Sequence, residues 1–257
     1  MKRPDFIMAG ATRSGLGALA KILDSHPQIY IPTRKEHRFF GSGRALQLAL
    51  DSCMSDFKNA VDGKVGNQIS ENRILHGEEE FDPARAREGA PMAKVIFTLR
   101  DPVERTYLQY LYAREDRREK ARNFIQAIEE ELSGKRSPDT TGKCWIYKNQ
   151  YQTHIEHWLS FFPRDRVHIM VYEEWTDING YKTALKELAK FLELPSSKPI
   201  TENCADVFEQ ETIEPLPKKY PPLSSALKEQ MDDILSLDKT YIANFLGRDI
   251  PAWNTKK

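Results

Sequence analysis

The sequence is short of cysteine and has no excess of either charge. Its 257 residues include three cysteines, Cys53, Cys144 and Cys204, which form no CxxC pair and no cluster with histidine at metal-ligand spacing. This pattern predicts reduced thiols in a cytoplasmic protein and no metal site. Lysine plus arginine and aspartate plus glutamate each number 38. The balance argues against a broad surface for nucleic acid or for an anionic membrane.

Long apolar runs are absent as well. No stretch reaches the roughly 18 consecutive apolar residues that a membrane-spanning helix needs. An expected strand begins so near the first residue that we expect no signal peptide. Hydrophobic residues make up 40% of the chain, which is enough for a substantial core. The length suits one domain over residues 1–257.

Short apolar runs alternate with helical patterns. Strands are expected near 6–9, 28–32, 63–69, 93–99 and 167–172, and helices near 19–23, 44–61, 103–132, 146–162, 185–192, 223–237 and 239–246. The alternation predicts an α/β fold of three layers, with a central parallel sheet of about five strands between helices. Ligands bind such sheets at the carboxyl ends of the strands. The loops after Ala9 and Leu99 would meet there if their strands are neighbours.

The loop after the first strand has the composition of an anion site. It contains Gly10, Arg13, Gly15 and Gly17 and leads into a helix, whose first N–H groups can bind an anion. An ordinary tight turn between a strand and a helix is the alternative. The P-loop pattern G-x-x-x-x-G-K-[ST] is incomplete, because Leu16 and Gly17 stand where lysine and the metal-binding hydroxyl are needed. An ATPase or kinase is therefore disfavoured.

Three segments together resemble the sulfotransferases that use 3′-phosphoadenosine-5′-phosphosulfate (PAPS). The first is Gly10-Ala-Thr-Arg-Ser-Gly-Leu-Gly-Ala-Leu19 with Leu23-Asp-Ser-His-Pro27, which is similar to the family's 5′-phosphosulfate loop. The second is Leu99-Arg-Asp-Pro-Val-Glu-Arg-Thr-Tyr-Leu-Gln-Tyr110, which is similar to its 3′-phosphate motif. The third runs from Tyr151 through Trp158 and Phe162 to Tyr172-Glu173. The matches extend over residues 4–194.

The resemblance implies a P-loop-NTPase-like fold and an in-line, metal-independent transfer of a sulfuryl group from PAPS, with PAP as the product. Arg13 would stabilise the leaving phosphate with the N–H groups of residues 14 to 18, and Arg100 would bind the 3′-phosphate. The acceptor would be a hydroxyl, or an amine, of a small molecule. The implied nucleotide-binding positions are Thr12, Arg13, Ser14, Gly15, Leu16, Gly17, Ala18, Arg100, Leu108, Tyr151, Lys218 and Lys219.

The general base is expected in the loop after the second strand. Some members that resemble heparan-type sulfotransferases have glutamate in an E-x-x-F-F pattern, and Glu36 occupies that position here. His37 is the alternative base, since histidine titrates near neutral pH. A solvated charged loop before a buried pair of phenylalanines is the structural alternative. Three other histidines, His154, His157 and His168, are expected to be structural, and Trp158 and Phe162 are expected in the core.

Two departures from the family pattern leave other functions open. Leu16 and Gly17 replace two threonines of the phosphosulfate loop, and Leu108 replaces a serine that contacts the 3′-phosphate. A divergent P-loop nucleotide phosphotransferase is therefore one alternative, and a family member that binds the nucleotide without catalysis is another. The sequence indicates neither the acceptor nor the oligomeric state.

Overall fold

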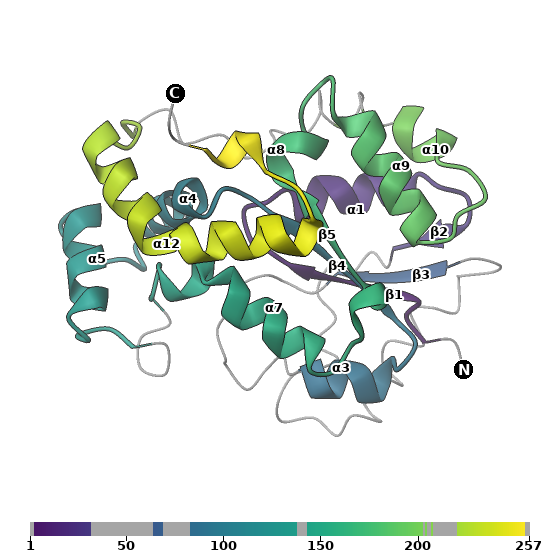
Figure 1. Cartoon of the computed structure of the whole chain (residues 1–257), viewed down its shortest axis with the longest axis horizontal. Coiled ribbons are helices and arrows are strands. Elements are labelled where there is room, and N and C mark those ends of the chain that lie inside the picture. The colour runs from purple at the N-terminus through teal and green to yellow at the C-terminus, as the bar shows by residue number, and fades with distance from the viewer. Residues whose placement is uncertain are drawn as a thin grey trace.

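Five parallel strands form the centre of the molecule (Figure 1). The computed structural model describes residues 3–31, 64–68, 83–137, 143–202, 204, 207 and 220–254. The strands are β1 (Phe6–Gly10), β2 (Ile29–Tyr30), β3 (Lys64–Gln68), β4 (Lys94–Leu99) and β5 (Val167–Val171). Their order in the sheet is β2-β3-β1-β4-β5. The predicted parallel sheet is confirmed, and β1 and β4 are neighbours.

Helices cover both faces of the sheet, which gives the predicted three layers (Figure 1). One face packs against α1 (Leu16–Asp24), α8 (Tyr172–Trp175), α9 (Tyr181–Phe191) and α10 (Lys198–Glu202). The other packs against α3 (Pro83–Gly89), α7 (Tyr151–Leu159) and the end of α12 (Ser225–Leu246). Alternate residues of one strand serve the two cores, because successive strand side chains point to opposite faces. Phe6 and Met8 lie in the first core and Ile7 in the second.

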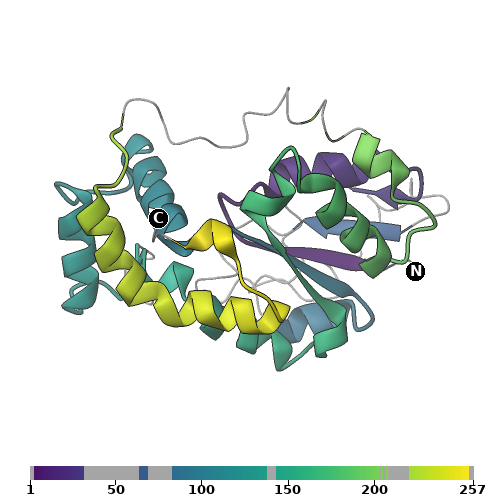
Figure 2. The same ribbon diagram turned by 45° about the horizontal axis from the view of Figure 1, so that its top comes forward.

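A third cluster of apolar side chains lies beyond the carboxyl ends of the strands. It joins α4 (Pro102–Glu115), α5 (Phe124–Leu132) and the first half of α12. Figure 2 shows these helices beside the sheet rather than over it. The single-turn elements η2 (Tyr147–Asn149), η3 (Arg164–Arg166) and η4 (Pro251–Trp253) connect the layers.

The expected helix over 103–132 is wrong, because two helices occupy that range. α4 ends at Glu115, and residues 114–122 are almost all charged, so they offer no apolar face to continue the helix. Arg117 adopts a left-handed conformation with φ 55°, and the N–H groups of Arg118 and Glu119 both donate to the carbonyl of Ala113. Asn123 then caps α5 by accepting from the N–H of Gln126.

Two expected helices near the C-terminus are a single helix, α12. Asp238 lies between the two expected segments and forms part of the helix. The Asp238 carboxylate is buried and accepts the backbone N–H of Gln152 at the start of α7. The helix continues through Asp238 and ends at its C-cap residue, Gly247.

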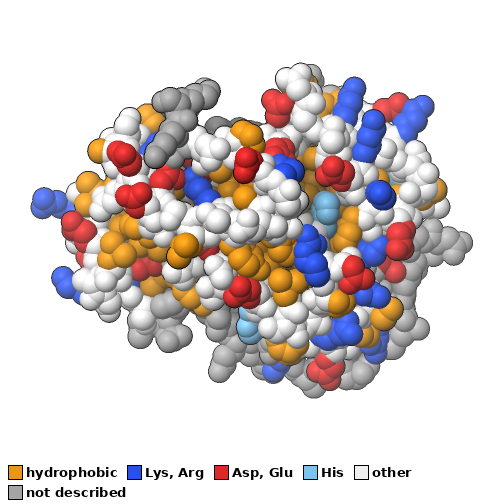
Figure 3. Space-filling model, in the orientation of Figure 1, with side chains coloured by type: hydrophobic (Ala, Val, Ile, Leu, Met, Phe, Trp, Pro, Cys, Tyr) orange, Lys and Arg blue, Asp and Glu red, His pale blue; other side chains and the backbone are white. Residues whose placement is uncertain are grey.

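Charged side chains of both signs are interspersed on the face drawn in Figure 3. No helix within the described ranges combines the length and the apolar character that crossing a membrane requires. Trp158 and Phe162 are fully buried in the core, as the sequence predicts. The expected helix over 44–61 lies outside the described residues.

Candidate active site

The loop between β1 and α1 ends in a helix N-terminus with no side-chain cap. Gly15 is the N-cap residue, in a left-handed conformation with φ 80°, and no side chain accepts a hydrogen bond from the first turn. The first three N–H groups of α1, from Leu16, Gly17 and Ala18, have no acceptor within the helix. The helix dipole adds a partial positive charge at the same point. This is the geometry that binds a phosphate-type anion.

Two hydroxyls in this loop are buried without a hydrogen-bond partner. Thr12 Oγ1 and Ser14 Oγ have none among the described residues, although Thr12 is 3% exposed and Ser14 is 0% exposed. A buried hydroxyl without a partner costs free energy. An anion at the N-terminus of α1 would supply the missing acceptor oxygens. We call residues 11–15 the anion loop, since their geometry fits such a group.

Two arginines follow the neighbouring strands β1 and β4. The guanidinium of Arg13 lies 3.6 Å from the centre of the Tyr112 ring, which belongs to α4. The guanidinium of Arg100 lies 4.8 Å from the centre of the Tyr172 ring. Because β1 and β4 pair in parallel, the loops after them emerge at the same edge of the sheet. Both arginines are partly exposed and so remain accessible to a ligand.

A buried arginine, Arg105, fixes the shape of the anion loop, although the sequence alone assigned it no role. Arg105 is 0% exposed, and its Nε donates to the carbonyl of Thr12 at 2.6 Å. Its Nη1 donates to the carbonyl of Lys148 and to Asn149 Oδ1, both at 2.8 Å. Arg105 therefore ties the anion loop to η2. Its place in the second motif was the available signal.

The loop between β4 and α4, residues 100–101, is held from several sides; we call it the Arg100 loop. Asp101 caps α4 by accepting from the N–H groups of Val103 and Glu104, and it pairs with Lys239 of α12 at 2.7 Å. Burial raises the pKa of Asp101, and the Lys239 ammonium opposes that rise. Tyr151 donates its hydroxyl to the carbonyl of Arg100 at 2.8 Å.

Tyr151 and Leu108 differ from the loop hydroxyls, because the Tyr151 hydroxyl already donates to a protein carbonyl and the Leu108 side chain is apolar. Tyr151 is 1% exposed, and burial raises the pKa of its hydroxyl. Its contact is with the backbone of the Arg100 loop. Leu108 is fully buried on α4, and Leu16 packs in the core between the sheet and α1, so its backbone N–H alone faces the anion loop. Four predicted site residues, Glu36, His37, Lys218 and Lys219, lie outside the described residues.

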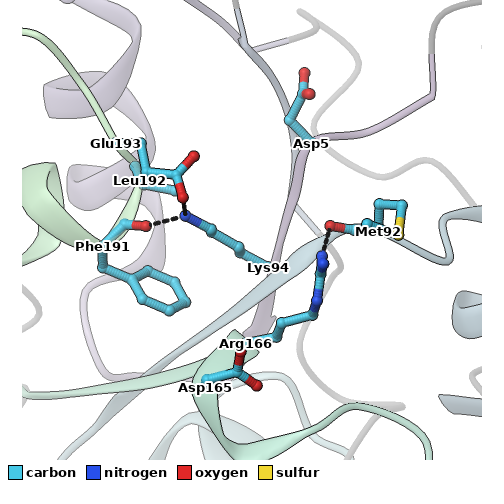
Figure 4. Close-up of a pocket in the computed structure, with 8 residues that line it drawn as sticks. All are labelled: Asp5, Met92, Lys94, Asp165, Arg166, Phe191, Leu192 and Glu193. Atoms are coloured by element: carbon cyan, nitrogen blue, oxygen red, sulfur yellow. Dashed lines mark hydrogen bonds and ion pairs between the residues drawn. The ribbon is translucent and has the colours of Figure 1, made fainter.

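A hollow of about 380 Å³ lies at the amino ends of the strands, away from the two loops (Figure 4). Its cations are already matched by protein groups. Lys94 donates to the carbonyl of Phe191 and pairs with Glu193 at 2.9 Å, and Arg166 donates to the carbonyl of Met92. This hollow at the amino ends of the strands is therefore a poorer anion site than the loops at the carboxyl ends.

Two of the histidines, the buried His154 and the partly buried His168, lie in structural positions. His154 Nε2 lies 2.9 Å from the carbonyl of Tyr147, and burial lowers the pKa of this histidine to about 4. His168 stacks on Phe191, and burial lowers its pKa to about 4 as well. Both are neutral at pH 7 and lie away from the two loops. No cluster of three or more potential metal-ligating side chains occurs within the described part of the chain.

The fold and the two loops define an α/β protein whose first loop joins a strand to a helix as a P-loop does. A family model described as "Sulfotransferase domain" matches residues 3–234. The chain belongs to this sulfotransferase family, and transfer of a sulfuryl group is the family's activity.

Relatives and solved structures agree with this assignment. The Caenorhabditis elegans protein "Bifunctional heparan sulfate N-deacetylase/N-sulfotransferase 1" is 25% identical over 272 residues, covering 97% of this chain and 31% of that protein. The human protein "Bifunctional heparan sulfate N-deacetylase/N-sulfotransferase 3" is 26% identical over 276 residues, covering 97% of this chain and 31% of that protein. This chain thus spans about a third of the length of the curated relatives it matches.

Two solved structures show the same fold. A sulfotransferase from Alicyclobacillus acidocaldarius has a TM-score of 0.70 at 22% identity and covers 98% of this chain and 99% of its own. The mouse sulfotransferase SULT7A1 complexed with PAP has a TM-score of 0.57 at 12% identity and covers 96% of this chain and 88% of its own.

Proposed function

We propose that this protein transfers the sulfuryl group of PAPS to a hydroxyl or amine of an acceptor. The observation that carries the proposal is the uncapped N-terminus of α1 with two buried, unpartnered hydroxyls, Thr12 and Ser14, beside it. PAPS has anionic groups at its 5′ and 3′ ends. The anion loop and the Arg100 loop lie at the same edge of the sheet and match that pair of charges.

Each loop has a distinct task in this proposal. The N–H groups of Leu16, Gly17 and Ala18 and the hydroxyls of Thr12 and Ser14 bind the 5′-phosphate. The Arg13 guanidinium offsets the charge that grows on this phosphate as the sulfuryl group leaves. Arg100 binds the 3′-phosphate through charge-assisted hydrogen bonds. When bound, PAPS supplies the activated sulfuryl group, and no metal is required.

Other residues would complete the site. Glu36 is the proposed base that removes the acceptor proton, with His37 as the alternative. Lys218 and Lys219 are proposed to add positive charge near the nucleotide. The described chain resumes at Tyr220, and the carbonyl of Pro221 accepts the hydroxyl of Tyr107 on α4 at 2.8 Å.

A small molecule with a hydroxyl is the first candidate acceptor. An amine, such as that of an amino sugar within a polysaccharide, is the second candidate, because the curated relatives are named heparan sulfate N-sulfotransferases. We propose one domain over residues 1–257. The cytoplasmic location expected from the sequence stays a prediction.

Nucleotide binding tests the proposed donor. Isothermal titration should show that the protein binds PAP more tightly than 5′-AMP, since 5′-AMP lacks the 3′-phosphate. Arg100→Ala should weaken PAP binding by about 10- to 100-fold and leave 5′-AMP binding unchanged, which is the effect of losing a hydrogen-bonded charge. Arg122→Ala, which removes an exposed arginine at the start of α5, is the matched control and should change neither affinity.

Product formation tests the transfer itself. Mass spectrometry with PAPS and a panel of hydroxyl and amine acceptors should detect a sulfated product, and Arg13→Ala and Glu36→Ala should reduce its rate. Hydrolysis of ATP that depends on Mg²⁺ would instead support the nucleotide phosphotransferase. PAP binding without any transfer would support the non-catalytic family member.

A further inference from the structure

The single turn of α8 contacts both ligand-binding loops with different side chains. It comes directly after β5 and comprises Tyr172, Glu173, Glu174 and Trp175. We propose that α8 positions the two loops through two separable contacts, one from Trp175 to the anion loop and one from Glu173 to the Arg100 loop. This inference rests on the proposed function and assigns positioning residues to it.

Trp175 holds the anion loop through a relay of two buried hydrogen bonds. Its Nε1 donates to Thr98 Oγ1 at 2.8 Å, and Thr98 Oγ1 donates to the carbonyl of Ser14 at 2.8 Å. Trp175, Thr98 and Ser14 are all 0% exposed. A hydroxyl has one proton to donate and can accept another, so Thr98 serves both partners at once. The relay fixes the backbone of the loop at Ser14, next to the N-terminus of α1.

The Trp175 ring also leaves no room for a side chain at Gly15. A Cβ atom built on Gly15 would lie 2.5 Å from Cζ2 of Trp175 and 3.1 Å from Cε2 of Tyr172. The two rings meet edge to face, with centroids 5.9 Å apart. The N-cap residue of α1 is thus packed against α8, which sets where the first N–H groups of α1 lie.

Glu173 holds the Arg100 loop through its two carboxylate oxygens. Oε1 accepts the backbone N–H of Asp101 at 2.8 Å, and Oε2 accepts Nε1 of Trp253 at 2.8 Å. Tyr172, the preceding residue, lies under the guanidinium of Arg100. Glu174, the next residue, contacts neither loop residue in this way. Its carboxylate accepts from the Arg248 guanidinium at the surface, from Nη2 at 2.5 Å and from Nη1 at 2.7 Å. One turn therefore has two carboxylates with different tasks.

Ligand discrimination separates the two contacts. Thr98→Val removes the hydroxyl while keeping the shape of the side chain, and it leaves Trp175 Nε1 and the Ser14 carbonyl unpaired. We expect Thr98→Val to weaken 5′-AMP and PAP by the same factor, about tenfold, because both bind the anion loop through the 5′-phosphate. Thr98→Ser restores the hydroxyl and should restore both affinities. Trp175→Phe removes only the first donor and should act in the same direction as Thr98→Val.

Glu173→Gln should weaken the binding of one ligand only. The amide has only one oxygen, so either the Asp101 N–H or Trp253 Nε1 loses its acceptor, and residue 173 holds the Arg100 loop less firmly. We expect PAP to weaken by about tenfold while 5′-AMP stays unchanged, so that the preference for PAP falls. Glu174→Gln is the matched control from the same turn and should leave both affinities unchanged.

A general loss of structure would weaken both ligands, so it would not produce the selective loss of PAP binding that we expect for Glu173→Gln. If Glu173→Gln weakens 5′-AMP and PAP by the same factor, or if neither Thr98→Val nor Glu173→Gln changes either affinity, α8 does not position the loops separately and the inference is wrong. Failure of the wild-type protein to bind PAP would be a different result, because it would overturn the proposed function. Circular dichroism of each variant confirms that the protein compared is folded.

Discussion

Gly15→Ala tests the packing between the anion loop and α8 most directly. Gly15 has φ 80°, and an alanine Cβ there would lie 2.5 and 2.8 Å from two carbon atoms of the Trp175 ring. A left-handed conformation costs a residue with a Cβ about 1–2 kcal/mol, and an overpacked site costs about 1–3 kcal/mol more. We therefore expect the free energy of unfolding to fall by about 2–5 kcal/mol. The ring has little freedom to yield, because it is fully buried and hydrogen-bonded to Thr98.

Gly247→Ala separates the two costs. Gly247 ends α12 with φ 68°, and nothing lies within 4 Å of an added Cβ, so this variant carries the conformational cost alone, about 1–2 kcal/mol. Guanidinium unfolding followed by circular dichroism measures both variants. Adding Trp175→Phe to Gly15→Ala removes the two carbon atoms that clash, so the double variant should lose less than the sum of the single losses. Equal losses for Gly15→Ala and Gly247→Ala would refute the reasoning.

Two bases with lowered pKa values, Lys148 and His168, should make stability depend on pH. Lys148 is 6% exposed over the Trp145 ring, and burial lowers its pKa to about 7. The unfolded chain binds this proton more tightly, so stability is lost as pH falls from 10.5 towards 7. Lys148→Met should stabilise the protein by about 3 kcal/mol at pH 7, and this gain should shrink as pH rises towards 10. Chemical denaturation at both pH values measures the gain. The control Lys186→Met, at an exposed lysine, should show no such trend. For His168, whose folded pKa is about 4 against an ordinary 6.5, stability falls as pH drops through that interval. His168→Gln should reduce the loss of stability between pH 7 and pH 5 by about 1 kcal/mol, measured by thermal melts at both pH values. The control is His157→Gln, at an exposed histidine. The same loss of stability in both variants would contradict the prediction.

The sheet could be predicted because each strand is a compact local signal. Residues 94–99 and 167–171 are apolar runs bounded by turns, and such runs alternate with helical patterns. The same logic failed where local composition and tertiary contact disagree. Asp238 separates the two expected C-terminal helices in the sequence, and its carboxylate accepts the N–H of Gln152, 86 residues earlier in the chain. No pattern within a few residues encodes that partner.

The site shows the same division between local and distant signals. Arg13 and Arg100 follow strands inside two short motifs, so the sequence could propose both as ligand-binding residues. Thr98, Glu173 and Trp175 were not given a role, because their partners are 72 to 84 residues away. The motif around Tyr172-Glu173 was visible, but its meaning required the contact between Glu173 and Asp101.

The two departures from the family pattern have unequal consequences. Leu16 packs in the core and presents only its backbone to the anion loop, while Thr12 and Ser14 already offer two buried hydroxyls there. The loss of a threonine at position 16 therefore does not argue against a phosphate site. Leu108 is fully buried and offers no polar group, so among the described residues that the family resemblance assigns to the 3′-phosphate, Arg100 has the only charge. The rigidity of the Arg100 loop, fixed by Tyr151, Glu173 and Lys239, then matters more, because a single guanidinium binds well only when its position is set in advance.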